Sequence, residues 1–368
     1  MRLSTIVLLA CAVPFVASTD PRVLPALPSD SSNDSGTLQV TMEAKTEFPG
    51  GLAGKADCDA QRNIYLRPVG DETSKKYHPV SALPIRKVRP DGSLAGTFSI
   101  GDASPGLLAI DFFVQGDGKL YQAARSESDR SVYVISYSSD GSVRSKSRLQ
   151  TEFFVPYKVA VFPSGEVLVS GIHGEYNRTP FTAVYRPDGT LIKEMYEPED
   201  EDSKNRAEAG EPGFRPDNME SSNDFVVRGD AALGSDGNVY LLRASSPALI
   251  YAISSKGQIV RKLRIASPDP NFAAGKLKSA PGMLAISFLR KGTNTGLIQV
   301  VDYEGRRIAT YVPKDKRMYP GLLACYGSQG FTFVSLEEGG NLRLNTAVPK
   351  WAPADSPFRT RLGSKRAD

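Results

Sequence analysis

The chain has 368 residues, of which 40% are apolar and 23% are charged, a composition typical of a folded globular protein and not of a disordered one. With 45 basic and 41 acidic residues its formal net charge is +4, and the Lys and Arg residues are scattered. This balance argues against nucleic acid or another polyanion as a partner.

The first 18 residues have the pattern of an export signal. Arg2 supplies a positive charge, Leu3–Val16 is almost wholly apolar, and the small residues Ala17 and Ser18 follow. No other apolar run approaches the roughly 18–20 residues that a helix needs to cross a bilayer. We therefore predict a cleaved signal peptide at 1–18 and an exported protein, periplasmic or extracellular, without a transmembrane segment.

Two other interpretations of this segment stay open. The sequence Leu8-Leu9-Ala10-Cys11 is similar to a bacterial lipobox, in which the cysteine becomes lipidated, although the run after Cys11 stays apolar. An uncleaved membrane anchor is the other interpretation, for which the run is short. Residues 19–36 are rich in Pro, Ser and Asp, and we expect a disordered linker there.

A turn of the Asp-Gly type recurs about every 48 residues. Gly92, Gly141 and Gly189 are 49 and 48 residues apart, and Gly257 and Gly305 are again 48 apart. Asp-Gly and its relatives favour two-residue hairpin turns that need a positive φ, and apolar residues alternate on both sides of each one. Each turn is therefore predicted to join the third and fourth strands of a small antiparallel sheet.

A second series of turns is predicted to join the first and second strands of each sheet. Its members each lie between two apolar runs, at Ala60–Asn63, Gly116–Gly118, Pro163–Gly165, Ser235–Gly237 and Ser328–Gly330. The fifth unit is degenerate, and we place its turn at Lys291–Asn294, after an inner strand at Gly282–Ile286.

Six repeat units follow from the two series of turns, at about residues 47–100, 101–150, 151–197, 225–267, 275–312 and 317–348. A unit of this kind is one small sheet that cannot bury its own faces, so neighbouring units must pack against each other. We predict an all-β protein, a six-bladed β-propeller of four-stranded antiparallel blades over residues 37–348. A solenoid is the alternative, although its repeats are usually shorter, about 20–30 residues.

The repeat unit resembles that of the NHL and TolB-like group of six-bladed propellers. An apolar strand, a D-x-G-x-hydrophobic-aromatic turn and a second Asp-Gly turn carry this resemblance over residues 47 to about 348. The group includes binding scaffolds, lactonases and lyases, so the resemblance implies an architecture and no single activity.

The last unit is one strand short. The segment Thr37–Glu43 alternates like a strand, and we predict that it supplies the outer strand of the sixth blade and closes the ring. Cys58 and Cys325 occupy equivalent repeat positions in the first and last blades. We interpret them as a disulfide across the closure or, alternatively, as two buried free thiols.

Two segments fall outside the repeats. Residues 197–224 interrupt the array after the third unit and begin with an acidic run, so we expect a solvated loop, or else a lid or a cation-attracting strip. Residues 349–368 are predicted to form a disordered polar tail.

No recognised catalytic motif occurs, and only two histidines are present. The predicted loop after the second strand of the third blade carries the most varied chemistry, and we name it as a candidate binding loop with the residues His173, Glu175, Tyr176 and Arg178. Lactonases among the similar propellers hold Ca²⁺ in the channel with Glu, Asn and Asp side chains. The residues at comparable places are Glu47, Glu152, Asn223, Asp224 and Asp230.

We therefore predict an exported, monomeric scaffold that binds a protein or small-molecule ligand on one face of the ring and needs no cofactor. A Ca²⁺-dependent hydrolase or lactonase with its site in the central channel is the first alternative. A lipid-anchored structural component of the cell envelope is the second.

Overall fold

A computed structural model describes residues 35–47, 53–68, 83–103, 106–126, 128–151, 154–173, 179–195, 229–243, 247–268, 270–290, 292–293, 295–337 and 341–349. All of them belong to one compact unit that begins at Ser35. The predicted signal peptide, almost all of the linker, the acidic insertion 197–224 and residues 350–368 lie outside the described residues.

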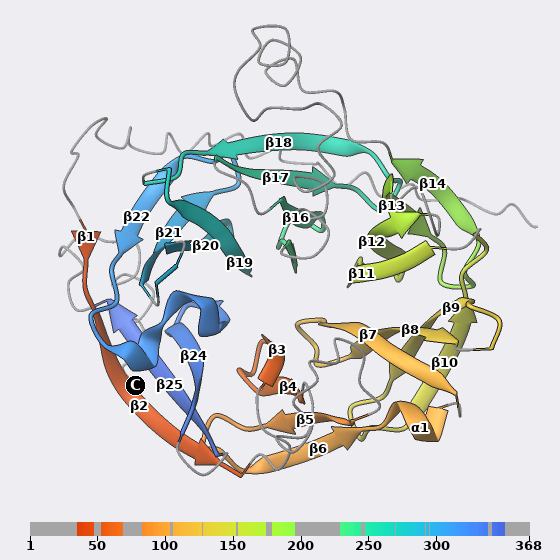
Figure 1. Cartoon of the computed structure of the whole chain (residues 1–368), viewed down its shortest axis with the longest axis horizontal. Coiled ribbons are helices and arrows are strands. Elements are labelled where there is room, and N and C mark those ends of the chain that lie inside the picture. Colours follow the sequence, from red (N-terminus) through yellow and green to blue (C-terminus); the bar gives the residue numbers. More distant parts are fainter. Residues whose placement is uncertain are drawn as a thin grey trace, which may run out of the picture. The chain divides into compact units, whose positions relative to one another are not determined.

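Six four-stranded antiparallel blades form a ring (Figure 1), which confirms the predicted six-bladed β-propeller. From the inner to the outer strand, blade 1 consists of β3 (Ala53–Cys58), β4 (Ile64–Pro68), β5 (Ile85–Val88) and β6 (Leu94–Phe98). Blade 2 consists of β7 (Leu107–Val114), β8 (Leu120–Ser126), β9 (Val132–Tyr137) and β10 (Val143–Arg148). Blade 3 consists of β11 (Phe154–Val161), β12 (Val167–His173), β13 (Thr179–Tyr185) and β14 (Leu191–Met195).

The second half of the ring repeats this order. Blade 4 consists of β15 (Asp230–Leu233), β16 (Val239–Arg243), β17 (Ala248–Ile253) and β18 (Ile259–Ile265). Blade 5 consists of β19 (Phe272–Ala280), β20 (Met283–Arg290), β21 (Gly296–Asp302) and β22 (Arg307–Tyr311). Blade 6 consists of β23 (Leu323–Gly327), β24 (Gly330–Leu336), β25 (Leu342–Pro349) and β2 (Leu38–Thr46).

The strand β2 closes the ring, as predicted. It pairs antiparallel with β25 from Leu38 opposite Pro349 to Thr46 opposite Leu342, and the chain then enters blade 1 (Figure 1). Blade 6 is therefore built from both ends of the described chain, and its outer edge is covered. The two-residue strand β1 (Ser35–Gly36) lies parallel to β22, so the last two residues of the predicted disordered linker form a strand instead.

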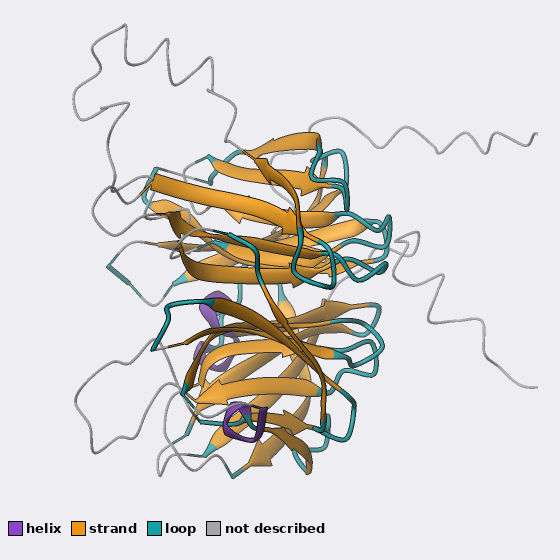
Figure 2. Cartoon of the chain, turned by 90° about the vertical axis from the view of Figure 1, so that its right-hand side faces the viewer, coloured by secondary structure: helices purple, strands orange, loops and turns teal. Residues whose placement is uncertain are grey.

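Helical structure in the described residues is confined to short segments (Figure 2). These are α1 (Ile100–Ala103) and the 3₁₀ turns η1 (Lys316–Met318) and η2 (Pro320–Leu322). None of the described helices has the length or the apolar character needed to cross a membrane.

The core lies between the blades. Phe98 of blade 1 packs edge-on against Tyr137 of blade 2, with ring centroids 5.8 Å apart, and a buried cluster that includes Ile85, Phe112 and Leu120 surrounds them. A single blade would leave these faces in water, so burial of apolar surface between neighbouring sheets stabilises the array as a whole.

The predicted turns between third and fourth strands are confirmed, since Gly92, Gly141, Gly189, Gly257 and Gly305 all have a positive φ there. At Gly92 an added Cβ would lie 2.2 Å from the carbonyl oxygen of Lys45, so both the conformation and the close packing require glycine.

The prediction for blade 5 was wrong. The first turn of this blade is at Pro281-Gly282, where Gly282 has a φ of 75°, and Met283–Arg290 is the second strand instead of the first. The inner strand is Phe272–Ala280, whose two lysines interrupt the apolar pattern that marks the other inner strands. The same two lysines lie in the central channel.

Candidate functional site

The central channel is the space enclosed by the six innermost strands, and a pocket of about 620 Å³ opens at one end of it. Residues of five blades line this pocket, mostly at the ends of inner strands and in the turns that follow them. The volume is within the range of about 300–1,000 Å³ that is usual for small-molecule sites. We call this space the channel pocket.

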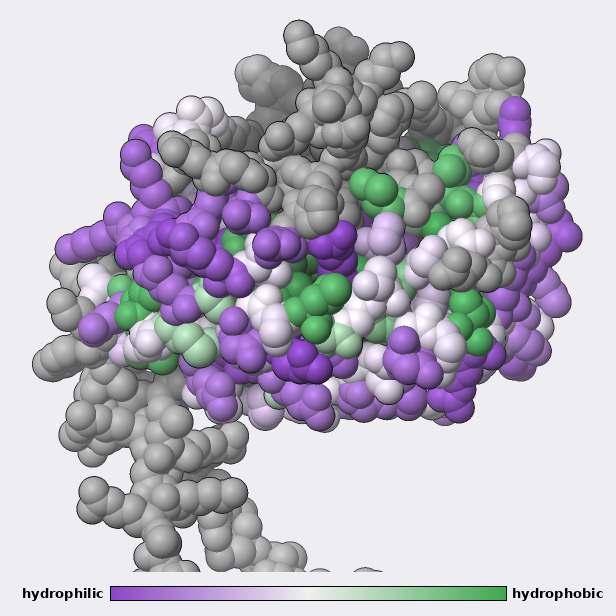
Figure 3. Space-filling model, turned by 90° about the horizontal axis from the view of Figure 1, so that it is seen from below, coloured by the Kyte–Doolittle hydropathy of each residue, from purple (hydrophilic) through white to green (hydrophobic). Residues whose placement is uncertain are grey.

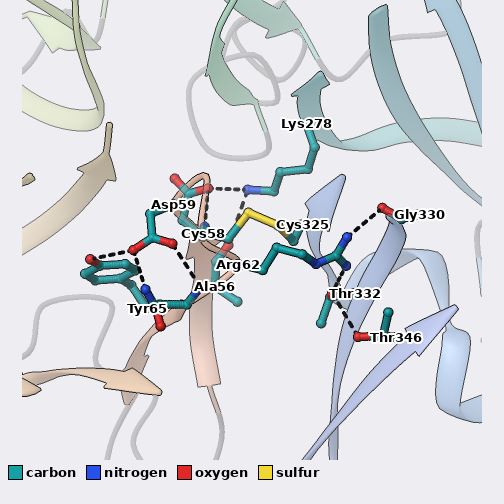
Figure 4. The surroundings of a disulfide bond; sticks show 12 residues. Ala56, Cys58, Asp59, Arg62, Tyr65, Lys278, Cys325, Gly330, Thr332 and Thr346 are labelled. Atoms are coloured by element: carbon teal, nitrogen blue, oxygen red, sulfur yellow. Dashed lines mark hydrogen bonds and ion pairs between the residues drawn. A yellow bond between two sulfur atoms is a disulfide. The ribbon is translucent and has the colours of Figure 1, made fainter. Parts of the chain in front are cut away.

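A disulfide between Cys58 of β3 and Cys325 of β23 forms part of the pocket wall (Figure 4). The two Cα atoms are 5.5 Å apart, because the inner strands of blades 1 and 6 are neighbours in the closed ring. Of the two interpretations of these cysteines, the structure has the disulfide.

Arg62 makes a second link between blades 1 and 6. It has a φ of 64° at the turn position where Gly118, Gly165 and Gly237 stand in other blades. Its guanidinium group donates to the hydroxyl of Thr332 and to the carbonyl oxygen of Gly330, the latter at 3.5 Å (Figure 4). A non-glycine residue in this conformation is strained, so its contacts across the interface compensate for a local cost.

A buried ion pair lies at the inner side of the pocket. Lys278 of β19 donates to Oδ1 of Asp57 at 3.1 Å and to the carbonyl oxygen of Ala56 at 3.3 Å, and its Nζ is 3.9 Å from Oδ2 of Asp230. Burial would lower the pKa of the Lys278 ammonium group, but attraction by Asp57 and Asp230 outweighs it and raises this pKa above its ordinary value. Lys278 is therefore a positive charge at neutral pH.

A second ion pair lies between blades 1 and 2. Nζ of Lys55 is 2.9 Å from Oδ1 of Asp111, while Oδ2 of Asp111 accepts the backbone N–H of Val159 in blade 3 at 3.0 Å. Burial opposes the charge on Asp111, but Lys55, Lys158 and Arg67 outweigh it and lower the pKa of this carboxyl group. The single carboxylate thus connects three blades.

Asp230 has the equivalent position between blades 4 and 5. Its Oδ2 accepts the backbone N–H of Leu277 at 3.0 Å, and its Oδ1 accepts that of Ala231 at 3.0 Å. Burial opposes its charge, but the nearby lysines, Lys278 first, lower the pKa of this carboxyl group. Both oxygens of Asp230 therefore already accept a backbone hydrogen bond.

The remaining predicted site residues do not assemble around Asp230 in the described structure. Glu47 is exposed, and its carbonyl oxygen accepts a hydrogen bond from Arg86 at 3.4 Å. His173 ends β12. Six predicted residues lie outside the described residues, namely Glu152, Glu175, Tyr176, Arg178, Asn223 and Asp224, and of His173 only the backbone is described. Within the described part of the chain, no three or more His, Cys, Asp or Glu side chains form a group that could hold a metal ion.

The charged residues of the channel other than Asp230 were not among the predicted site residues. The available signal was a charged residue within an otherwise apolar inner strand, as at Lys55, Asp111 and Lys158. Each of these residues lies three positions before the last residue of its inner strand that pairs across the first hairpin. These closing pairs are Cys58 with Ile64, Val114 with Leu120, and Val161 with Val167. Aligning the repeats on that pair would have placed them side by side.

The outer side of the ring is a weaker candidate for a binding site. On the face shown in Figure 3, apolar side chains form small patches separated by polar ones. Among the exposed large apolar side chains, Leu94, Val143 and Leu191 each follow the outer turn of a separate blade. Such scattered residues are normal for a protein surface, so the channel is the better candidate site.

The sequence matches no family profile and no curated protein. Several solved structures are similar to this chain at low identity. A calcium-binding protein, regucalcin, from Agrobacterium tumefaciens is 12% identical with a TM-score of 0.47, covering 82% of this chain and 92% of its own. A gluconolactonase from Xanthomonas campestris is 12% identical with a TM-score of 0.44, covering 87% and 99%. A protein of unknown function from Bacteroides caccae is 13% identical with a TM-score of 0.46, covering 73% and 84%.

These similarities concern the propeller fold alone, and no activity follows from them. The finer assignment to the NHL and TolB-like group stays a prediction.

Proposed function

We propose that the protein is an exported binding scaffold that holds a small hydroxyl-rich molecule in the channel pocket. The observation that carries this proposal is a pocket of about 620 Å³, lined by five blades, with the buried pair of Asp57 and Lys278 at its inner side. A site built on inner strands is held in place by the packing of the whole ring, so its polar groups are preorganised.

The pair leaves both a donor and an acceptor for a ligand. Oδ1 of Asp57 accepts the bonds from Lys278 and from the N–H of Cys58, while Oδ2 accepts none from the described residues. Lys278 has three N–H groups and donates two of them to Asp57 and Ala56. A hydroxyl group can donate to the carboxylate and accept from the ammonium group, which supports sugars and polyols as the ligand class.

The test is a binding measurement with a set of sugars, polyols and sugar lactones, using calorimetry on the full chain and two tryptophan variants. Ser328 is exposed at the pocket mouth, so Ser328→Trp would obstruct the pocket without entering the core. Lys256 is exposed in an outer turn of blade 4, and Lys256→Trp is the matched control. We expect binding to the wild type and to the control, and at least about tenfold weaker binding to Ser328→Trp, because lost contacts worth about 1.4 kcal/mol change affinity tenfold.

Two outcomes would overturn the proposal: no member of the set binds the wild type, or both tryptophan variants bind as well as the wild type. Turnover of a lactone that depends on added Ca²⁺ would replace the scaffold by the hydrolase alternative. Mass spectrometry of the mature protein tests the proposed export by signal-peptide cleavage. A mature chain that begins at Thr19 lacks Cys11 and so carries no lipid there.

A further inference from the structure

Charges of opposite sign alternate from blade to blade in the central channel. Lys55, Asp111, Lys158 and Asp230 each lie three positions before a hairpin-closing pair, the last being Leu233 with Val239. Lys276 is the equivalent in blade 5, because Asp230 accepts the N–H of the residue after Lys276 just as Asp111 accepts the N–H of the residue after Lys158. We call these five residues the charged layer.

Blade 6 interrupts the alternation. Its inner strand is Leu-Ala-Cys-Tyr-Gly, from Leu323 to Gly327, and contains no charged residue. A strict alternation would place a carboxylate there, between Lys276 of blade 5 and Lys55 of blade 1. The inner strands of the described ring therefore carry four lysines in the channel, at 55, 158, 276 and 278, against three aspartates, at 57, 111 and 230.

The lysines differ in their partners. Lys55 and Lys278 form ion pairs at 2.9 and 3.1 Å. Neither Lys158 nor Lys276 has a carboxylate oxygen within 4.0 Å of Nζ among the residues that the structure describes, although both side chains are half-buried. Because a half-buried ammonium group has lost much of its hydration, an ion that contacts it recovers part of that loss.

The two unpaired lysines influence each other. For Lys276, burial first, and then repulsion by Lys158, Lys278 and Lys55, outweigh the attraction of Asp230 and lower its pKa to about 8. Burial also lowers the pKa of Lys158, with Lys55 and Arg67 adding repulsion and Asp111 and Asp230 opposing it. Lys276 is still largely protonated at pH 7, and a nearby negative charge would stabilise the protonated state of either lysine.

We propose that the central channel has an anion site at Lys158 and Lys276, which takes a small molecule bearing a carboxylate or phosphate group. The site does not include Asp57 or Lys278, and it does not depend on the nature of the pocket ligand. Asp111 and Asp230 do not occupy it because their oxygens accept backbone N–H groups and face Lys55 and Lys278.

The test is calorimetric titration of the full chain with inorganic phosphate and, separately, with malonate, at pH 7 and low ionic strength. Two probes distinguish a tetrahedral from a planar anion. Lys276→Met should weaken binding about 10- to 100-fold, because a hydrogen bond to a charged group contributes roughly that much. Lys276→Arg keeps the charge and should bind within a few-fold of the wild type, and Lys256→Met, in an exposed outer turn, is the matched control.

The pH dependence gives a second readout. Binding to the wild type should fall as the pH rises through about 8 because Lys276 loses its proton there, whereas Lys276→Arg should keep binding to higher pH. In the absence of anion, Lys276→Met should melt at or above the wild-type temperature, since it removes an unpaired charge; this control separates lost binding from lost folding.

The proposal is overturned if neither anion binds the wild type, or if Lys276→Met and Lys256→Met bind equally. The two proposals fail independently. Ser328→Trp should lose sugar binding and keep anion binding, whereas Lys276→Met should lose anion binding and keep sugar binding.

Discussion

The interface between blades 6 and 1 and the interface between blades 2 and 3 are held together in different ways. Blades 6 and 1 are linked by a disulfide, by the Arg62 contacts and by strand β2, which belongs to blade 6 and leads into blade 1. Blades 2 and 3 rely on a buried carboxylate, with Asp111 accepting the N–H of Val159, and on Gln115, which donates to the carbonyl oxygen of Phe162 at 2.9 Å.

The chain itself explains this difference. It runs directly from blade 2 into blade 3, so those blades stay close even when the side-chain contacts break. The ends of the repeat array meet only at the interface of blades 6 and 1, and bringing them together restricts a long stretch of chain. At that interface the disulfide and strand β2 hold the two blades together, as the continuous chain does between blades 2 and 3.

We expect the largest effect from Asp111→Ala. The substitution leaves Lys55, whose side chain is 9% exposed, as a buried charge without its partner, which costs about 3–5 kcal/mol of unfolding free energy. Urea denaturation measures it. The double variant Asp111→Ala/Lys55→Met should recover most of the loss, leaving about 1 kcal/mol for the unpaired N–H of Val159. Equal losses in the single and double variants would show that the ion pair is not the cause.

The disulfide should have the next largest effect. Cys58→Ser/Cys325→Ser removes a link between residues 267 positions apart, and we expect a loss of about 2–4 kcal/mol in unfolding free energy. The wild type in reducing agent is the control and should unfold with the variant. If β2 alone suffices to close the ring, the oxidised wild type, the reduced wild type and the variant will unfold together. The disulfide would then not contribute to the difference between the two interfaces.

Asp230→Asn should have a smaller effect than Asp111→Ala. The asparagine keeps an oxygen for the N–H of Leu277, and Lys278 keeps Asp57, so we expect a loss of about 1–3 kcal/mol at pH 7. Chemical denaturation at a series of pH values measures it.

The same variant gives the pH dependence. The folded-state pKa of Asp230 is lowered, so its stabilising contribution is present above the unfolded value of about 3.9 and is lost as the pH falls below it. The wild type should therefore lose more stability than Asp230→Asn between about pH 5 and pH 2. Parallel curves over this range would contradict the role given to the carboxylate.

The smallest effect is expected at Arg62. Arg62→Gly relieves the positive φ of 64° but loses the contacts with Gly330 and Thr332, so the net change should stay within about 1 kcal/mol. Arg62→Ala loses the same contacts and keeps the strain, and it should be less stable than Arg62→Gly by about 1 kcal/mol. A ranking in which alanine is the more stable would rule out strain at this turn.

Much of the fold could be predicted from local patterns. Glycines with a positive φ mark the turns between third and fourth strands, so their spacing counted the blades correctly, and the missing last strand pointed to residues 37–43. The pattern failed in blade 5. Its inner strand carries Lys276 and Lys278, and a prediction based on apolar alternation passed over it in favour of Met283–Arg290.

The candidate site was largely hidden for the same reason. Lys55, Asp111 and Lys158 are buried or half-buried charges in strands that we interpreted by their apolar residues. Burial of such groups becomes tolerable only when a partner from another blade is present, and the partner is tens of residues away in sequence: 56 between Lys55 and Asp111, and 221 between Lys278 and Asp57.

The sequence by itself determined the blade count, the turns between third and fourth strands and the closing strand, because turn chemistry and strand alternation are local properties. Only the tertiary structure decided that Cys58 lies beside Cys325, that Lys278 meets Asp57, and that Lys158 and Lys276 lack carboxylate partners among the described residues. Such pairings depend on which strands face the central channel of the closed ring, and that arrangement exists only once all six blades have packed.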